Sequence, residues 1–141
     1  MDDKLTGGCA CGAVRYECTG KAISSFHCHC RACQQYTGSG YLASTLFPAA
    51  TFKIVKGSVR EYPTTGDNGG VVYRGFCENC GSPVVNRLAR LPQFVGIPAG
   101  SMDDSSRHQP TMDLFVRDAQ PWDHMDPTRQ KYKEGPPPRN A

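Results

Sequence analysis

Cysteines are the residues in this chain whose type and spacing could do chemistry. Seven of the eight lie in three short motifs, and no two motifs share the same spacing. They are a C-x-C at Cys9 and Cys11, a C-x-C-x2-C at Cys28, Cys30 and Cys33, and a C-x2-C at Cys77 and Cys80. Thiolates this close in sequence can converge on one metal ion, whereas a disulfide framework needs partners further apart.

The first and third motifs together supply four thiolates. Glycines flank both motifs and permit the tight turns that bring neighbouring thiolates to one point. Four cysteines complete the tetrahedral coordination that zinc adopts in structural sites. We therefore expect Cys9, Cys11, Cys77 and Cys80 to hold a structural zinc ion that links distant parts of the chain and contributes folding energy.

The middle motif supplies only three thiolates, and the fourth coordination position of a bound ion would stay open. Three protein ligands plus water or substrate is the arrangement of catalytic zinc. Three thiolates give such a site a net charge of about −1, which favours binding an incoming thiol over generating hydroxide. The alternative is a second structural site closed by His29, Cys18 or a distant residue. His29 is a poor candidate, because in an extended C-x-C it points away from its neighbours.

Cys18 is the remaining cysteine. It shares the face of an alternating segment with Val14 and Tyr16, so we expect a small buried core residue, with metal ligation as the alternative. A dithiol redox function is weakly supported, because no βαβ pattern surrounds Cys77. An iron–sulfur cluster would enlist four cysteines, which the middle motif lacks.

Several polar residues are weaker candidates for a site. Ser39, in a Gly-Ser-Gly turn, could offer a hydroxyl to a ligand, although a flexible turn is the simpler interpretation. Arg74 could bind a substrate carboxylate, although an exposed strand arginine is commoner. Asp103, Asp104 and His108 lie in a polar loop without an identifiable partner in the sequence.

Short segments rich in β-branched and aromatic residues must position these cysteines. Frequent Gly and Pro separate the segments, and the first hundred residues show no sustained helical periodicity, which favours a mainly β, antiparallel fold. We expect a single helical turn at 31–36, a loop at 64–70 and Trp122 packed near the last strand. The expected strands are 13–18, 21–27, 41–46, 52–55, 58–62, 71–76, 83–85, 94–97 and 113–116.

Length and charge narrow the range of functions. The 141 residues suit one zinc-binding domain, which we place at 1–125, followed by a Pro-rich and flexible tail at 126–141. A net charge of +3 gives little reason to expect a nucleic-acid partner. The sequence begins without an apolar signal segment and has no apolar run that could span a membrane. Clustered cysteines then indicate a reducing, cytoplasmic location and no membrane partner.

The motifs in order resemble one family, the glutathione-dependent formaldehyde-activating enzymes, which also include centromere protein V. The resemblance spans residues 5–104, and the combination of motifs is specific although each C-x2-C alone is not. After Asp104 it fades, because the family often has a His-Ile pair before its final strand where this chain reads QPTMDLF. The matching stretches are GGCACGAVRYEC, FHCHCRACQQYTGSGY, FKIVKGSVREY, YRGFCENCGSPV and IPAGSMDD.

The resemblance implies a compact β-tent fold with two zinc ions, the second partly occupied. It implies a structural zinc on Cys9, Cys11, Cys77 and Cys80, and a functional zinc on Cys28, Cys30 and Cys33. The implied activity is that of a carbon–sulfur lyase, S-(hydroxymethyl)glutathione synthase, which joins glutathione to formaldehyde. The alternative is a non-catalytic zinc module that carries glutathione or docks a protein or nucleic acid. The natural substrate and the oligomeric state do not follow from the motifs.

Overall fold

The computed structural model describes residues 4–66 and 69–136, and within them the chain is mainly β, as the sequence predicts. One α-helix, α1 (Arg31–Thr37), accompanies the strands. The strands are β1 (Leu5–Gly8), β2 (Arg15–Cys18), β3 (Ser24–Cys28), β4 (Leu42–Pro48), β5 (Phe52–Lys56), β6 (Arg60–Thr65), β7 (Val71–Phe76), β8 (Pro83–Leu88), β9 (Phe94–Pro98), β10 (Met112–Leu114) and β11 (Gln130–Lys131).

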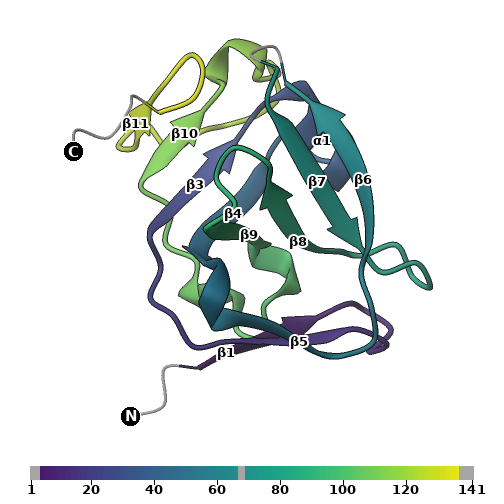
Figure 1. Cartoon of the computed structure of the whole chain (residues 1–141). Helices are drawn as coiled ribbons and strands as arrows, with labels where there is room; N and C mark the ends of the chain where they lie inside the picture. The colour runs from purple at the N-terminus through teal and green to yellow at the C-terminus, as the bar shows by residue number, and fades with distance from the viewer. Residues whose placement is uncertain (1–3, 67–68, 137–141) are drawn as a thin grey trace.

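The strands form two sheets. The smaller has the order β1-β2-β5, and the larger has the order β11-β10-β3-β4-β9-β8-β7-β6. Figure 1 shows the smaller sheet at the base of the view, crossing below the strands of the larger one. Neighbours pair antiparallel except β10, which runs parallel to both β3 and β11. Two segments distant in sequence, β3 and β10, therefore lie side by side.

Two apolar clusters fill the interior. The larger packs residues of the smaller sheet against β8 and β9, and Tyr16 and Ile97 are fully buried within it. The Tyr16 hydroxyl lies 2.7 Å from Ser101 Oγ, so this buried phenol is hydrogen-bonded. The smaller cluster contains Cys28, Cys33, Leu42 and Leu114, from β3, α1, β4 and β10.

Strand boundaries follow the sequence pattern where the pattern is strong. β7 covers the predicted 71–76, whereas β6 continues to Thr65 and β8 to Leu88, because antiparallel pairing across β7 carries both strands further. β1, with the sequence LTGG, was not expected as a strand. Its glycines weaken the pattern, and pairing with β2 together with the burial of Leu5 supplies the stability.

The C-terminal part differs from the expected 113–116 strand. β10 ends at Leu114 because Phe115 adopts a left-handed backbone conformation, with φ of 55°. Trp122 is 62% exposed, and its ring lies beside Gly40. Within the predicted tail, residues 126–136 include β11, which pairs with β10. Residues 137–141 of that tail, and residues 67 and 68 of the predicted 64–70 loop, lie outside the described residues.

Helices long and apolar enough to cross a membrane are absent from the part of the chain that the structure describes.

Candidate metal centres

Two turns, each connecting strands of a different sheet, bring together Cys9, Cys11, Cys77 and Cys80. The first pair lies between β1 and β2, and the second between β7 and β8. Their four Sγ atoms all lie within 4.8 Å of one another. Each turn closes through glycine with φ of 79°, and the Gly81 amide donates to the Cys77 carbonyl oxygen at 2.7 Å. The structure therefore brings these four cysteines together, as the sequence predicts for a shared site.

The sulfur positions fit a tetrahedral ion. A Zn–S bond of about 2.3 Å gives a tetrahedral edge of about 3.8 Å between sulfurs. Cys11 Sγ lies 3.6 Å from Cys9 Sγ and 3.9 Å from Cys77 Sγ. Amide donors point at the sulfurs: Val14 N lies 3.2 Å from Cys9 Sγ, and Asn79 Nδ2 lies 3.3 Å from Cys11 Sγ. Such donors stabilise thiolates, as metal ligation requires.

Cys28, Cys30 and Cys33 form a second group, which we call the trio. Cys28 ends β3, Cys30 is the N-cap of α1, and Cys33 lies in the first turn of the helix. The three Sγ atoms lie within 4.8 Å of one another, and the Cys33 amide donates to Cys30 Sγ at 3.3 Å. The end of a strand and the start of a short helix therefore position three sulfurs from six consecutive residues.

The trio is largely enclosed. Cys33 is 2% exposed and Cys28 is 8% exposed, whereas Cys30 is only partly buried. Hydrogen bonds from the Cys28 and Cys33 thiols lower the pKa of Cys30 to about 2, and the bond with Cys30 raises the pKa of Cys28. A bound metal ion would replace these protons, because cysteine ligates metals as the thiolate. The apolar side chains around the trio are Phe26, Tyr36, Leu42, Met112, Leu114, Phe115 and Tyr132.

Arg74 is buried and contacts the trio. The interpretation of Arg74 as an exposed strand arginine was therefore wrong. The side chain is 6% exposed, and Nη1 donates to Cys33 Sγ at 3.3 Å. β7 is covered by α1 at this point, and the guanidinium lies 5.5 Å from the centre of the Tyr36 ring. The nearby cysteine sulfurs, led by Cys33, favour the charged form and raise the pKa of Arg74 against the effect of burial. The sequence did not indicate this burial, because Arg74 and Cys33 are brought together only by tertiary packing.

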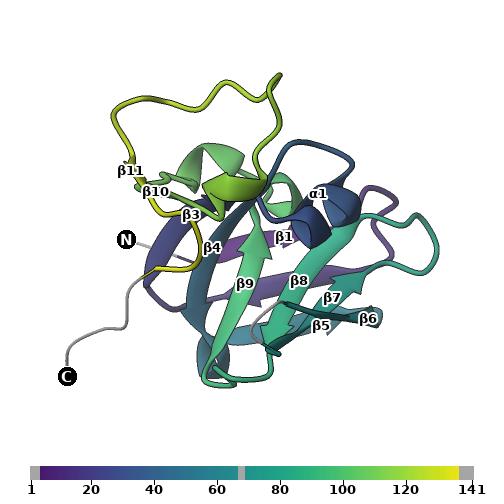
Figure 2. The same cartoon turned by 90° about the horizontal axis from the view of Figure 1, so that it is seen from above.

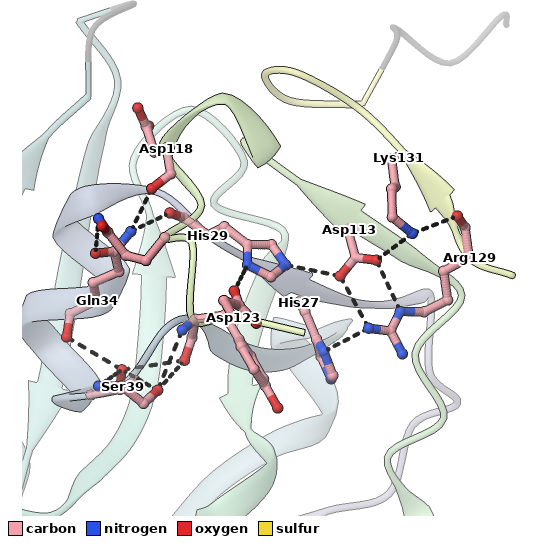
Figure 3. Close-up of polar contacts among 12 residues, drawn as sticks. His27, His29, Gln34, Ser39, Asp113, Asp118, Asp123, Arg129 and Lys131 are labelled. Carbon is pink, nitrogen blue, oxygen red and sulfur yellow. Dashed lines mark hydrogen bonds and ion pairs between the residues drawn. The ribbon is translucent and has the colours of Figure 1, made fainter. Parts of the chain in front are cut away.

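His29 lies between two cysteines of the trio, but its ring is directed into a separate buried network (Figure 3). Nδ1 lies 2.6 Å from Asp123 Oδ2, and Nε2 lies 2.9 Å from Asp113 Oδ1. The imidazole is 1% exposed, and the two carboxylates are nearly as buried. The expectation that His29 points away from the neighbouring cysteines agrees with this arrangement.

The network continues into the C-terminal segment, which we define as residues 112–136. Arg129 Nε lies 3.1 Å from Asp113 Oδ2, and Lys131 Nζ lies 3.5 Å from the same oxygen. Gln34 of α1 donates to the carbonyl oxygens of His29 and Asp118, at 2.8 and 2.9 Å. Figure 2 shows this segment passing beside α1. Sequence reasoning missed the network because Asp113 and Asp123 lie 84 and 94 residues from His29.

Cys18 takes no part in either group. It is fully buried in the larger apolar cluster, and its Sγ lies 3.5 Å from Thr51 Oγ1. The prediction of a core residue is confirmed. Ser39 is held within its own turn, since its hydroxyl donates to the Tyr41 carbonyl oxygen at 2.7 Å.

The polar loop has partners that the sequence did not show. Asp103 forms an ion pair with Arg15 and accepts a hydrogen bond of 2.7 Å from Thr6. Asp104 accepts from the Ser106 amide at 3.2 Å and caps a short turn. His108 Nδ1 lies 2.9 Å from Thr45 Oγ1. These residues connect the loop to the neighbouring sheets.

Comparisons with known proteins agree with the family resemblance of the cysteine motifs. The profile of the glutathione-dependent formaldehyde-activating enzymes matches residues 4–118. A protein of Halomonas elongata, named as a candidate glutathione-dependent formaldehyde-activating enzyme, is 27% identical over 131 residues, which cover 89% of this chain and 83% of that protein. A crystal structure of a Rhodobacter sphaeroides protein shares the fold, with a TM-score of 0.57 and 20% identity over 70% of this chain and 88% of that one. The chain belongs to the glutathione-dependent formaldehyde-activating enzyme family.

Proposed function

We propose that the protein is a zinc-dependent enzyme of the carbon–sulfur lyase type, which forms S-(hydroxymethyl)glutathione from glutathione and formaldehyde. The observation that carries the proposal is the trio: three sulfurs within 4.8 Å beside a buried arginine, in a chain of this family. A reducing compartment, the cytoplasm, suits the function because all eight cysteines are free thiols in the structure.

Two zinc ions have matching ligand sets. Cys9, Cys11, Cys77 and Cys80 would hold the structural ion, and the trio would hold a second ion with an open coordination position. A zinc ion at the trio would supply Lewis-acid stabilisation of an incoming thiolate.

The chain's own groups prepare this position. The Cys33 amide donates to Cys30 Sγ and stabilises negative charge there. The Arg74 guanidinium adds a positive charge next to Cys33, which offsets the excess of thiolates. Apolar side chains such as Leu42 and Leu114 reduce the access of water, which strengthens both effects.

The overall reaction adds a thiol across a carbonyl group. The sulfur–carbon bond forms, the carbonyl π bond breaks, and the thiol proton ends on the new hydroxyl oxygen, so no oxidant or reductant is needed. Holding the thiol as thiolate beside the aldehyde would provide the rate gain through proximity and charge stabilisation.

An exchange experiment tests the proposal. NMR exchange rates between formaldehyde, glutathione and their adduct would be measured with the zinc-loaded protein, with Cys30→Ser and with Cys18→Ala as the matched control. We expect accelerated exchange that Cys30→Ser abolishes and Cys18→Ala keeps. Rates equal to those in buffer, or equal in wild type and Cys30→Ser, would contradict catalysis of this reaction.

One observation favours a second candidate, a carrier that binds glutathione without turnover. Both ring nitrogens of His29, the imidazole next to the trio, lie beside carboxylate oxygens, so this group is not available as a general base. Calorimetry that detects glutathione binding, combined with exchange at the buffer rate, would support the carrier.

A further inference from the structure

A cavity of about 320 Å³ lies between α1, β6 and β7, and Arg74 forms part of its wall. Ala32, which lies between Cys30 and Cys33 in the first turn of α1, also lines it. The volume is within the range of small-ligand sites, about 300–1,000 Å³. The complete lining is Ala32, Gln35, Tyr36, Tyr62, Thr64, Arg74, Phe76 and Gly81.

A larger cavity of about 640 Å³ lies beside Cys9, but its charged side chains already bind each other. Arg15 and Asp103, both in its lining, form an ion pair. The cavity at Arg74 differs, because its only charged lining residue is an arginine and no aspartate or glutamate is among the eight.

Arg74 has donors left for a ligand. Nη1 donates to Cys33 Sγ, and Nε donates to Thr64 Oγ1 at 3.1 Å. A guanidinium carries five N–H donors, and Nη2 has no acceptor among the described residues. No carboxylate in the described part of the chain pairs with Arg74, although the side chain is 6% exposed. The cysteine sulfurs balance part of the Arg74 charge on the Nη1 side, and the remaining Nη2 donors favour an anion in the adjoining space.

We infer that the cavity is a binding subsite for the carboxylate of a thiol substrate, held by the Nη2 side of Arg74 while the substrate sulfur reaches the trio. The inference rests on the proposed function and names the part of the substrate that is recognised. The remaining walls suit a peptide backbone, since Tyr36, Phe76 and the 64% exposed Tyr62 offer flat apolar surfaces.

The distances match a short peptide. Cys33 Sγ lies 3.3 Å from Nη1, and a carboxylate oxygen bound to Nη2 would lie within about 8 Å of that sulfur. A substrate sulfur on the same ion would lie about 3.8 Å from Cys33 Sγ, so its distance to the carboxylate oxygen falls between about 4 and 12 Å. Extended peptide spans about 3.3–3.6 Å per residue, so one to two residues reach into this range. In glutathione, the glycine carboxylate follows the cysteine directly and has this reach.

The charges select the glycine end of glutathione over the γ-glutamyl end. The α-carboxylate of the γ-glutamyl group is accompanied by an ammonium group, which would meet a guanidinium and no acidic residue in this cavity. The glycine carboxylate carries no ammonium group, and its charge is complementary to Arg74.

The test compares ligands that differ only at this carboxylate. Calorimetry with the zinc-loaded protein would measure glutathione, the ethyl ester of its glycine carboxylate, and the amide of the same carboxylate. We expect the last two to bind about 10- to 100-fold more weakly, the range for one charge-assisted hydrogen-bond pair. Equal affinities for glutathione and the ester would overturn the subsite, and this comparison needs no variant.

Variants assign the effect to the residue. Arg74→Gln should weaken glutathione about as much as esterification does and abolish the difference between glutathione and the ester, while Arg74→Lys should retain part of it. Arg87→Gln, an exposed arginine of β8 paired with Glu61, is the matched control and should leave both affinities unchanged. A difference between the ligands that survives in Arg74→Gln would overturn the assignment.

Measuring both ligand binding and adduct exchange distinguishes the carboxylate subsite from the catalytic proposal. If the ester is discriminated but adduct exchange stays at the buffer rate, the subsite stands and the catalytic proposal fails. If exchange is accelerated equally for glutathione and the ester, with equal affinities, catalysis stands and the subsite fails. Absence of glutathione binding overturns both.

Discussion

His29 is buried with a carboxylate on each side, at 2.6 Å from Nδ1 and 2.9 Å from Nε2. Ionised carboxylate oxygens accept hydrogen bonds and do not donate them, and the imidazole is the side chain that lies within hydrogen-bonding distance of both. Asp113 also pairs with Arg129 and Lys131, so replacing the imidazole with glutamine would chiefly deprive the buried Asp123 of its partner. The residue therefore acts as an internal link between β3 and the C-terminal segment.

We expect His29→Gln to lower the free energy of unfolding by about 3–5 kcal/mol, the cost of an uncompensated buried charge. Urea denaturation monitored by fluorescence would measure the change. His124→Gln is the control, because His124 is exposed and its replacement should change stability by less than about 0.5 kcal/mol. Similar stabilities for the two variants would contradict the linking role of His29.

At the scale of elements, α1 ends on Gly38, whose φ of 71° is left-handed and whose amide donates to the Gln34 carbonyl oxygen. A Cβ at Gly38 would meet no atom within 4 Å, so an alanine there costs backbone strain alone. We expect Gly38→Ala to reduce stability by about 1–2 kcal/mol. Gly100→Ala, equally unobstructed and without a positive φ, should be neutral or slightly stabilising in the same thermal melts. Equal melting temperatures would argue against the cap.

Two stacked imidazoles give the β3 region a pH dependence. The rings of His27 and His108 lie 5.3 Å apart, and burial lowers the pKa of His27 to about 4 and also lowers that of His108. The unfolded chain binds protons near the ordinary value of 6.5 while the folded chain does not, so stability is full above pH 6.5 and falls as the pH drops toward 4.

Replacing one imidazole should flatten this dependence. We expect the loss of stability between pH 7 and pH 5 to be smaller in His108→Asn than in wild type, because the variant lacks one group whose pKa is lowered on folding. Denaturant titrations at both pH values measure it, and protonation of the metal ligands is common to both proteins and cancels in the difference. An unchanged slope would show that His108 does not contribute.

The predictability of the elements depended on local signals. β7 was predicted correctly because four of its six residues are apolar or aromatic and the segment runs into Cys77, whereas LTGG at β1 carries no such pattern. The three cysteine motifs were visible because their ligands are neighbours in sequence. Arg74 beside Cys33 and Asp113 beside His29 were not visible, because only the packing of α1 on β7 and the parallel pairing of β3 with β10 brings them together.

At the scale of the whole molecule, the four-cysteine cluster joins the two sheets. Cys9 and Cys11 follow β1 of the smaller sheet, and Cys77 and Cys80 follow β7 of the larger one. A metal ion at this point would crosslink both sheets, and structural zinc binding contributes about 10–16 kcal/mol to folding in small domains.

Loss of this crosslink should be severe and distinct from loss of the second site. We expect Cys11→Ser to remove about one zinc per chain and to lower the melting temperature by more than about 10 °C. Cys30→Ser should also lower the zinc content but cost less stability, and Cys18→Ala should keep both ions. Elemental analysis with calorimetric melting would measure these changes, and a full zinc content in Cys11→Ser would contradict the assignment.

The parallel pairing of β10 with β3 also affects how long a metal ion would stay bound at the trio. The three cysteines of the trio are close together in sequence. The side chains of Leu114 and Phe115, which help to enclose them, come from a segment more than 80 residues later in the chain. We expect β10 to open before the rest of the larger sheet, because it is a strand of three residues with few backbone pairs. Hydrogen exchange at the β10 amides should then follow the same opening that exposes Cys28 and Cys33 to thiol reagents. The lifetime of the metal at the trio would be set by this opening and not by unfolding of the whole molecule.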